Sequence, residues 1–218
     1  MAIDRREIVI LGGPNGAGKT TAARVLLPDF LDLHPFLNAD DIARKIAPWD
    51  VDSVALAAGR QMIEQMRALV LDGQSFAFET TCSGKSYLRL LQQCKQDGWR
   101  ITLLYFWLPT PEDAVARVAR RVSQGGHNIP TDTVLRRYYA SVWNMRNLYL
   151  PLADEAEIYD NTDRKRIMIA EKREDLAFFV HDPERWARIA RNAASRWYCG
   201  REVMGSSFPA PGIPNAST

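Results

Sequence analysis

The sequence lacks long apolar runs and has few residues of the kinds that build metal centres or disulfide frameworks. Its 218 residues include three cysteines and three histidines, none at the spacing of a zinc site. We therefore expect reduced cysteines, no histidine metal site and no membrane span. A formal net charge of +2 and the absence of a basic run make nucleic acid an improbable ligand.

What is present is typical of a globular protein. Hydrophobic residues make up 46% of the chain and charged residues 25%, and the length suits one sizeable core. The charged start at residues 1–7 leads directly into an apolar run, so we expect no signal peptide and a cytoplasmic protein. Glycine, serine, proline and alanine dominate residues 200–218. We predict one domain over residues 1–199 and a flexible tail after it.

Residues 13–20 read GPNGAGKT, which has the spacing of a phosphate-binding loop. An apolar, β-branched run at 8–11 precedes the loop, and a helical pattern at 21–27 follows it. Glycines allow successive backbone N–H groups to point at phosphate oxygens, and the helix N-terminus adds partial positive charge. The predicted nucleotide contacts are Gly13, Asn15, Gly16, Ala17, Gly18, Lys19, Thr20 and Thr21. In this set Lys19 reaches the terminal phosphates and Thr20 ligands Mg²⁺.

Strand and helix patterns alternate along the chain. Apolar runs predict strands at 8–11, 36–39, 75–78, 101–107 and 157–159, with a hairpin over 166–180 and a final helix over 184–198. We predict a loop at 29–35 and helices opening at Ser83 and, behind a T-P-E-D cap, at Pro111. The alternation indicates a three-layer α/β fold, with a parallel sheet covered on both faces.

Acidic residues follow several of these strands. Ligands of such sheets bind at the carboxyl ends of the strands, so the phosphate loop, Asp40, Glu79 and Asp160 should meet at one edge. Asp40 is either a general base for an attacking hydroxyl or the N-cap of the following helix. Glu79 either assists Mg²⁺ or a substrate hydroxyl, or forms a salt bridge at the strand end.

Short polar residues after Glu79 suit a substrate. Thr81, Ser83 and Lys85 are candidates for hydrogen bonds to the acceptor, or ordinary helix caps.

Arginines dominate one face of the helix expected after residue 111. Arg117, Arg120 and Arg121 lie opposite a valine face and lead into the loop Gly125-Gly126-His127. We predict a lid over about residues 117–137 whose arginines neutralise charge on a triphosphate; the alternative is a solvated helix face.

Taken in order, GPNGAGKT, NADDIA, FAFETT, RVARRVSQGGHNIP and IYDN resemble the zeta-toxin-type P-loop kinases, over roughly residues 8–161. The resemblance implies a nucleotide-kinase-like fold with strand order 2-3-1-4-5, MgATP as donor and phosphorylation of UDP-N-acetylglucosamine. It implies that Asp40 is the base, that Glu79 and Thr81 hold the sugar nucleotide and that Arg117 or Arg121 contacts phosphate. Ser83 replaces the arginine of the family pattern, with Lys85 the nearest cation.

We therefore expect a cytosolic kinase whose acceptor is a small molecule, most simply a nucleotide sugar, with an antitoxin protein as a possible partner. Two alternatives stay open. One is a nucleotide-dependent ATPase or switch that acts on a partner, and the other is a kinase of another metabolite or nucleotide.

Overall fold

The computed structural model describes residues 6–51, 53–126, 128–163, 166–174 and 176–194. In these ranges the chain forms one seven-stranded sheet with the order β2-β3-β1-β4-β5-β6-β7. The strands are β1 (Glu7–Gly12), β2 (Phe36–Leu37), β3 (Phe76–Thr80), β4 (Arg100–Trp107), β5 (Glu155–Asp160), β6 (Ile167–Arg173) and β7 (Leu176–Val180). The first five are parallel and the last two antiparallel, which confirms the order 2-3-1-4-5 and the hairpin.

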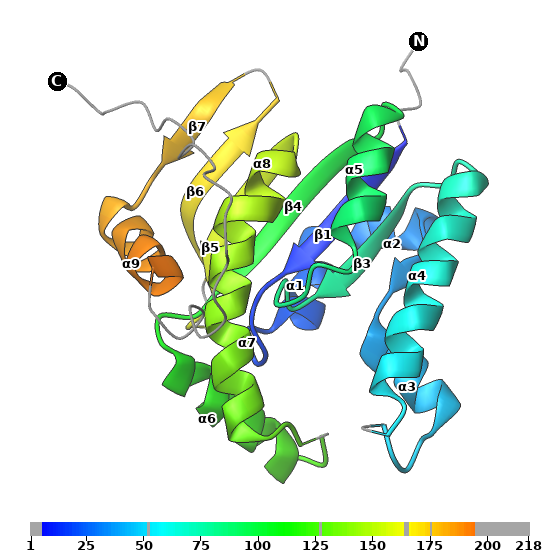
Figure 1. Cartoon of the computed structure of the whole chain (residues 1–218). Helices are drawn as coiled ribbons and strands as arrows, with labels where there is room; N and C mark the ends of the chain where they lie inside the picture. The colour runs from blue at the N-terminus through cyan, green and yellow to red at the C-terminus, as the bar shows by residue number, and fades with distance from the viewer. Residues whose placement is uncertain (1–5, 52, 127, 164–165, 175, 195–218) are drawn as a thin grey trace, which may run out of the picture.

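Helices cover both faces of the sheet, so its central strands are apolar along nearly their whole length. In Figure 1, α5 and α7 cross the near face, whereas α1 and α2 lie behind the sheet. The helices are α1 (Lys19–Leu26), α2 (Pro28–Leu33), α3 (Ala39–Ile46), α4 (Ala55–Leu71), α5 (Leu88–Gln96), α6 (Pro111–Ser123), α7 (Thr131–Asn144), α8 (Leu150–Leu152) and α9 (Pro183–Ala194). A π-helical turn, η1 (Met145–Tyr149), joins α7 to α8. Within the described ranges, none of the helices is long and apolar enough to cross a membrane.

Two predicted element boundaries are wrong. The expected loop at 29–35 contains α2, which starts with Pro28 at its first position, where a missing N–H costs nothing. The helix expected from Ser83 begins only at Leu88. The residues on either side of Ser83 are held by other elements: Asn144 donates to the Cys82 carbonyl (2.7 Å) and Tyr149 to the Gly84 carbonyl (3.1 Å).

The C-terminal elements continue the same sheet. β6 pairs with β5, and β7 extends the sheet by one further strand. Arg185 of α9 donates from Nε to Asp160 Oδ2 at the end of β5, over 2.8 Å. Trp186 of α9 packs against Phe178 of β7, with ring centroids 5.0 Å apart. The hairpin and α9 are thus tied to the core, and the predicted tail at 200–218 lies outside the described residues.

Candidate active site

The phosphate loop joins β1 to α1 as the sequence predicts. Gly13, Gly16 and Gly18 have φ values of 148°, 78° and 76°, in the region that L side chains rarely adopt. A Cβ at Gly13 would lie 2.3 Å from the carbonyl oxygen of Phe106 in β4. These glycines therefore allow both the tight turn and its close approach to the sheet.

Lys19 is buried inside the loop, with 6% of its surface exposed. Its ammonium donates to the carbonyls of Gly13 (2.9 Å) and Pro14 (3.1 Å) and lies 3.6 Å from Glu79 Oε1. Asn15 Oδ1 is also buried and has no hydrogen-bond partner in the part of the chain described. A buried cation next to a nest of backbone N–H groups suits an anionic ligand, whereas the Asn15 oxygen is an acceptor and suits a donor group.

Glu79 reaches the phosphate loop from β3. Its Oε2 accepts a hydrogen bond from the Thr20 hydroxyl at 2.6 Å. The strand-end salt bridge considered as an alternative is formed with Lys19 of the phosphate loop itself, so Glu79 lies at the candidate site under either interpretation. Carboxylate and hydroxyl oxygens are ligands that Mg²⁺ accepts, and Mg²⁺ commonly uses few protein ligands together with water and phosphates. The described residues hold no cluster of three or more histidine, cysteine or acidic side chains.

Asp40 is an exposed residue in the first turn of α3. The alternative role of N-cap is wrong for Asp40 because Asn38 occupies that position, and Asn38 Oδ1 accepts from the Asp40 backbone N–H at 2.8 Å. The carboxylate of Asp40 is left for other contacts. Sequence reasoning missed Asn38, although an asparagine directly before a helix is a recognisable cap signal.

Thr81 and Ser83 lie just past β3, beside the site. Their hydroxyl oxygens are 2.7 Å apart. Lys85 is turned toward α7, with its ammonium 5.7 Å from the centre of the Trp143 ring. Cys82, between Thr81 and Ser83 in the chain, is fully buried, and burial raises the pKa of its thiol to about 12.

Arg117 fixes α6 against the phosphate loop. Its guanidinium donates to the Gly16 carbonyl (3.3 Å) and to the Thr162 carbonyl. A Cβ on Gly16 would come 2.9 Å from Arg117 Cβ, so the two segments are in direct contact. Asn161, which sequence reasoning did not single out, supports the loop from β5 by donating to the Ala17 carbonyl at 2.5 Å.

The other predicted lid residues are placed in different ways. Arg120 is exposed and Arg121 half-buried, while His127 lies outside the described residues. Asp160 ends β5 at the expected edge, but its carboxylate accepts from Arg185 and from the Thr162 backbone N–H. It serves as an anchor for α9 and the loop after β5.

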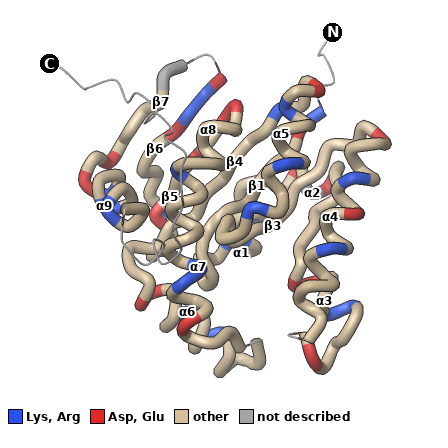
Figure 2. The backbone as a smooth tube through the Cα atoms, viewed as in Figure 1, with Lys and Arg blue, Asp and Glu red and all other residues tan. Residues whose placement is uncertain are grey.

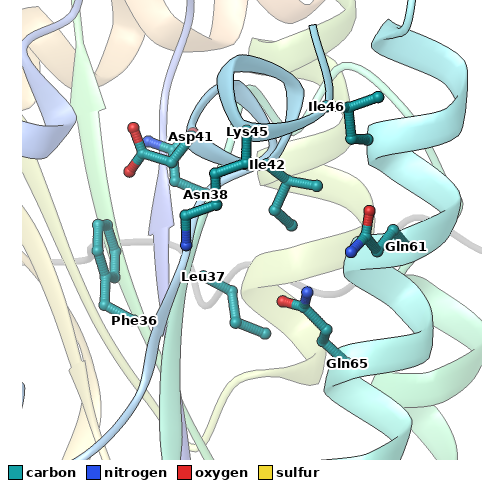
Figure 3. Close-up of a pocket in the computed structure, with 9 residues that line it drawn as sticks. All are labelled: Phe36, Leu37, Asn38, Asp41, Ile42, Lys45, Ile46, Gln61 and Gln65. Atoms are coloured by element: carbon teal, nitrogen blue, oxygen red, sulfur yellow. The ribbon is translucent and has the colours of Figure 1, made fainter. Parts of the chain in front are cut away.

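A pocket of about 310 Å³ opens between β2, α3 and α4, next to Asn38. Figure 3 shows the amides of Gln61 and Gln65 projecting from α4 toward Leu37 and Ile42. The residues that line the pocket are Phe36, Leu37, Asn38, Asp41, Ile42, Lys45, Ile46, Gln61 and Gln65. The pocket lining therefore combines apolar side chains with amide groups and two charged side chains, Asp41 and Lys45.

Comparison with known sequences gives two matches. The model of the family named Zeta toxin matches residues 2–173. An uncharacterized protein of Haemophilus influenzae is 32% identical over 134 residues, which cover 62% of this chain and 94% of that protein.

Comparison with solved structures identifies the fold. A chain of the AvrRxo1-ORF1:-ORF2 complex with ATP has a TM-score of 0.68 at 16% identity, over 93% of this chain and 66% of that chain. A structure of the PezAT chromosomal toxin-antitoxin system of Streptococcus pneumoniae has a TM-score of 0.60 at 17% identity, over 88% of this chain and 87% of that chain. This chain thus spans slightly less than two thirds of the AvrRxo1 chain.

Proposed function

Because this chain belongs to the Zeta toxin family, we propose that it is a kinase that transfers the γ-phosphate of ATP to a hydroxyl group of a small molecule. The observation that carries the proposal is the contact between two chain-distant segments. Thr20 and Lys19 of the phosphate loop both contact Glu79, which lies near the end of β3, next to β1. Phosphate binding and an acidic side chain are thereby combined at one edge of a parallel sheet.

The donor would be held by the loop itself. Backbone N–H groups of residues 15–19 and the N-terminus of α1 would bind the phosphates, and Lys19 would exchange its carbonyl partners for phosphate oxygens. Thr20 and Glu79 fit Mg²⁺ by their chemistry, directly or through water. Mg²⁺, when bound, would neutralise charge on the phosphates. Support for ATP comes from the fold shared with a protein whose structure is described with ATP.

Asp40 would act as the general base. It is exposed at the start of α3, and Asn38, two residues earlier, contacts both α3 and Glu79. Its carboxylate would accept the proton of the attacking hydroxyl. Lys19 and an arginine of α6, Arg117 or Arg121, would stabilise the transferred phosphoryl group. The contact between Arg117 and Gly16 of the phosphate loop supports this role for α6.

The proposed acceptor is a nucleotide sugar such as UDP-N-acetylglucosamine. Glu79 and Thr81 would hold its sugar, while Ser83 and Lys85, which depart from the family pattern, would tune the choice of acceptor. The pocket beside Asn38 offers amide groups to a neutral polar ring. Figure 2 shows acidic and basic residues interspersed along α3 and α4, an arrangement that favours a small acceptor over a nucleic-acid end.

An antitoxin partner is part of the same proposal. It rests on family membership and on the fold shared with a structure from a toxin-antitoxin system.

The test is to incubate the protein with MgATP and a panel of nucleotide sugars and to search by mass spectrometry for an added phosphate. We expect one class of acceptor to gain a phosphate and ADP release to depend on that acceptor. ADP release that is equally fast without any acceptor, and no phosphorylated product, would favour an ATPase or switch protein instead.

Two variants separate catalysis from binding. Asp40→Asn should retain ATP affinity and lose about 10²- to 10⁴-fold in transfer rate, because only proton removal is affected. Lys19→Ala should lose both binding and transfer, since it removes the cation that meets the phosphates. Full transfer activity in Asp40→Asn would exclude Asp40 as the base.

A further inference from the structure

Asn38 is held at both ends of its side-chain amide. Its Oδ1 accepts from the Asp40 backbone N–H at 2.8 Å and so caps α3. Its Nδ2 donates to Glu79 Oε2 at 3.1 Å. The side chain therefore connects the helix that carries the proposed base to the acidic residue near the end of β3.

Glu79 Oε2 receives two donors at the same atom. One is the Asn38 amide, and the other is the Thr20 hydroxyl at 2.6 Å. Lys19 approaches the other carboxylate oxygen, Oε1, at 3.6 Å. With both oxygens engaged from different directions, the carboxylate has a fixed orientation toward Thr20.

We propose that Asn38 is a positioning residue that links the metal-binding side of the site to the base on α3. The inference rests on the proposed kinase function. By orienting Glu79, Asn38 would set the geometry of Mg²⁺ binding at Thr20. By capping α3, it would hold Asp40 at a fixed distance from that metal.

The residue type fits both tasks. A carboxamide supplies one acceptor and two donors in one rigid plane. Aspartate would cap the helix equally well, but it would repel Glu79. Lysine would pair with Glu79, but it has no acceptor for the helix N–H groups and would add positive charge next to the metal. Serine would cap the helix but has no group that reaches as far as the Asn38 amide.

The first test is Asn38→Ser, with the Mg²⁺ dependence of ATP binding measured in the absence of any acceptor. Serine keeps the cap, so the melting temperature and the affinity for ATP without Mg²⁺ should stay close to wild type. Loss of a hydrogen bond to a charged group should raise the Mg²⁺ concentration at half-saturation about tenfold. Arg44→Ala is the matched control, because it removes an exposed ion pair with Asp41 on the same helix and should leave Mg²⁺ binding unchanged.

The second test places Asn38→Ser in a Glu79→Gln background. If Asn38 acts through Glu79, Asn38→Ser should add little to the loss of Mg²⁺ binding that Glu79→Gln already causes. An unchanged Mg²⁺ dependence in Asn38→Ser, or full additivity in the double variant, would overturn the inference. A wild-type protein that binds MgATP with the expected Asn38 effect but phosphorylates no acceptor would refute the kinase proposal alone.

Discussion

The charged residues of the site are partly satisfied before any ligand binds. Lys19 has lost most of its contact with water, yet it donates to two carbonyls and lies near one carboxylate. A buried ammonium without such partners would be costly. In the proposed kinase, phosphate oxygens would take the place of some of these acceptors around Lys19.

The buried thiol of Cys82 predicts how the stability of the folded protein depends on pH. The φ of Cys82 is 55°, its side chain is fully buried, and burial outweighs the nearby Lys19 charge, so the pKa rises from 9.0 to about 12. The folded state thus holds the thiol proton more tightly than the unfolded state. This contribution to stability is complete below pH 9 and is lost as the pH rises toward 12.

We expect the free energy of unfolding to fall as the pH rises above 9, and to fall less steeply in Cys82→Ala. Urea unfolding at a series of pH values measures both slopes. Cys94→Ala is the comparison variant, because burial also raises the pKa of Cys94, to about 11. Identical slopes in Cys82→Ala and wild type would show that Cys82 does not carry the effect.

At the scale of single elements, α6 depends on the cap at its start. Thr110 Oγ1 accepts from the Asp113 N–H at 3.1 Å, and Asp113 Oδ2 accepts from the Thr110 N–H at 3.1 Å. Thr110→Ala removes half of this capping box and should cost about 1 kcal/mol in urea unfolding. Thr110→Ser keeps the hydroxyl and should be nearly neutral. A loss as large in the serine variant would point to the methyl group instead of the cap.

The helix starts show how far local sequence reasoning reaches. The T-P-E-D pattern correctly predicted the start of α6 because all the groups of the cap lie within four residues. Ser83 looked like a comparable start, but α5 begins five residues later. The carbonyls of Cys82 and Gly84, on either side of Ser83, are satisfied by Asn144 and Tyr149, which are more than sixty positions away. Distant donors of this kind leave no local signal.

At the scale of the whole molecule, the C-terminal hairpin and α9 form part of one sheet and one core. Asp160 is buried, with 5% of its surface exposed, and Arg185 of α9 is its charged partner. Arg185→Met would leave this carboxylate with only Thr162 as a donor and should cost about 1–3 kcal/mol. Arg173→Met breaks a solvent-screened pair with Glu171 and should cost clearly less than Arg185→Met.

Urea unfolding of wild type and Arg185→Met measures this cost and also tests the prediction of a single domain. Circular dichroism and tryptophan fluorescence should follow one coincident unfolding transition in wild type and in Arg185→Met. Separate transitions would indicate that the hairpin and α9 unfold independently of the remaining sheet.

The phosphate loop, the parallel sheet and the strand edge that carries Glu79 were predictable from the amino-acid sequence alone. Each of these follows from short-range patterns: glycine spacing, apolar periodicity, and the rule that the carboxyl ends of parallel strands share one edge. Three contacts become visible only in the folded chain: Asn38 joins α3 to Glu79, Arg117 contacts Gly16, and Asp160 pairs with Arg185. These contacts depend on which distant segments meet, and a hydrogen bond between residues 38 and 79 or 117 and 16 is encoded by the packing of the whole sheet.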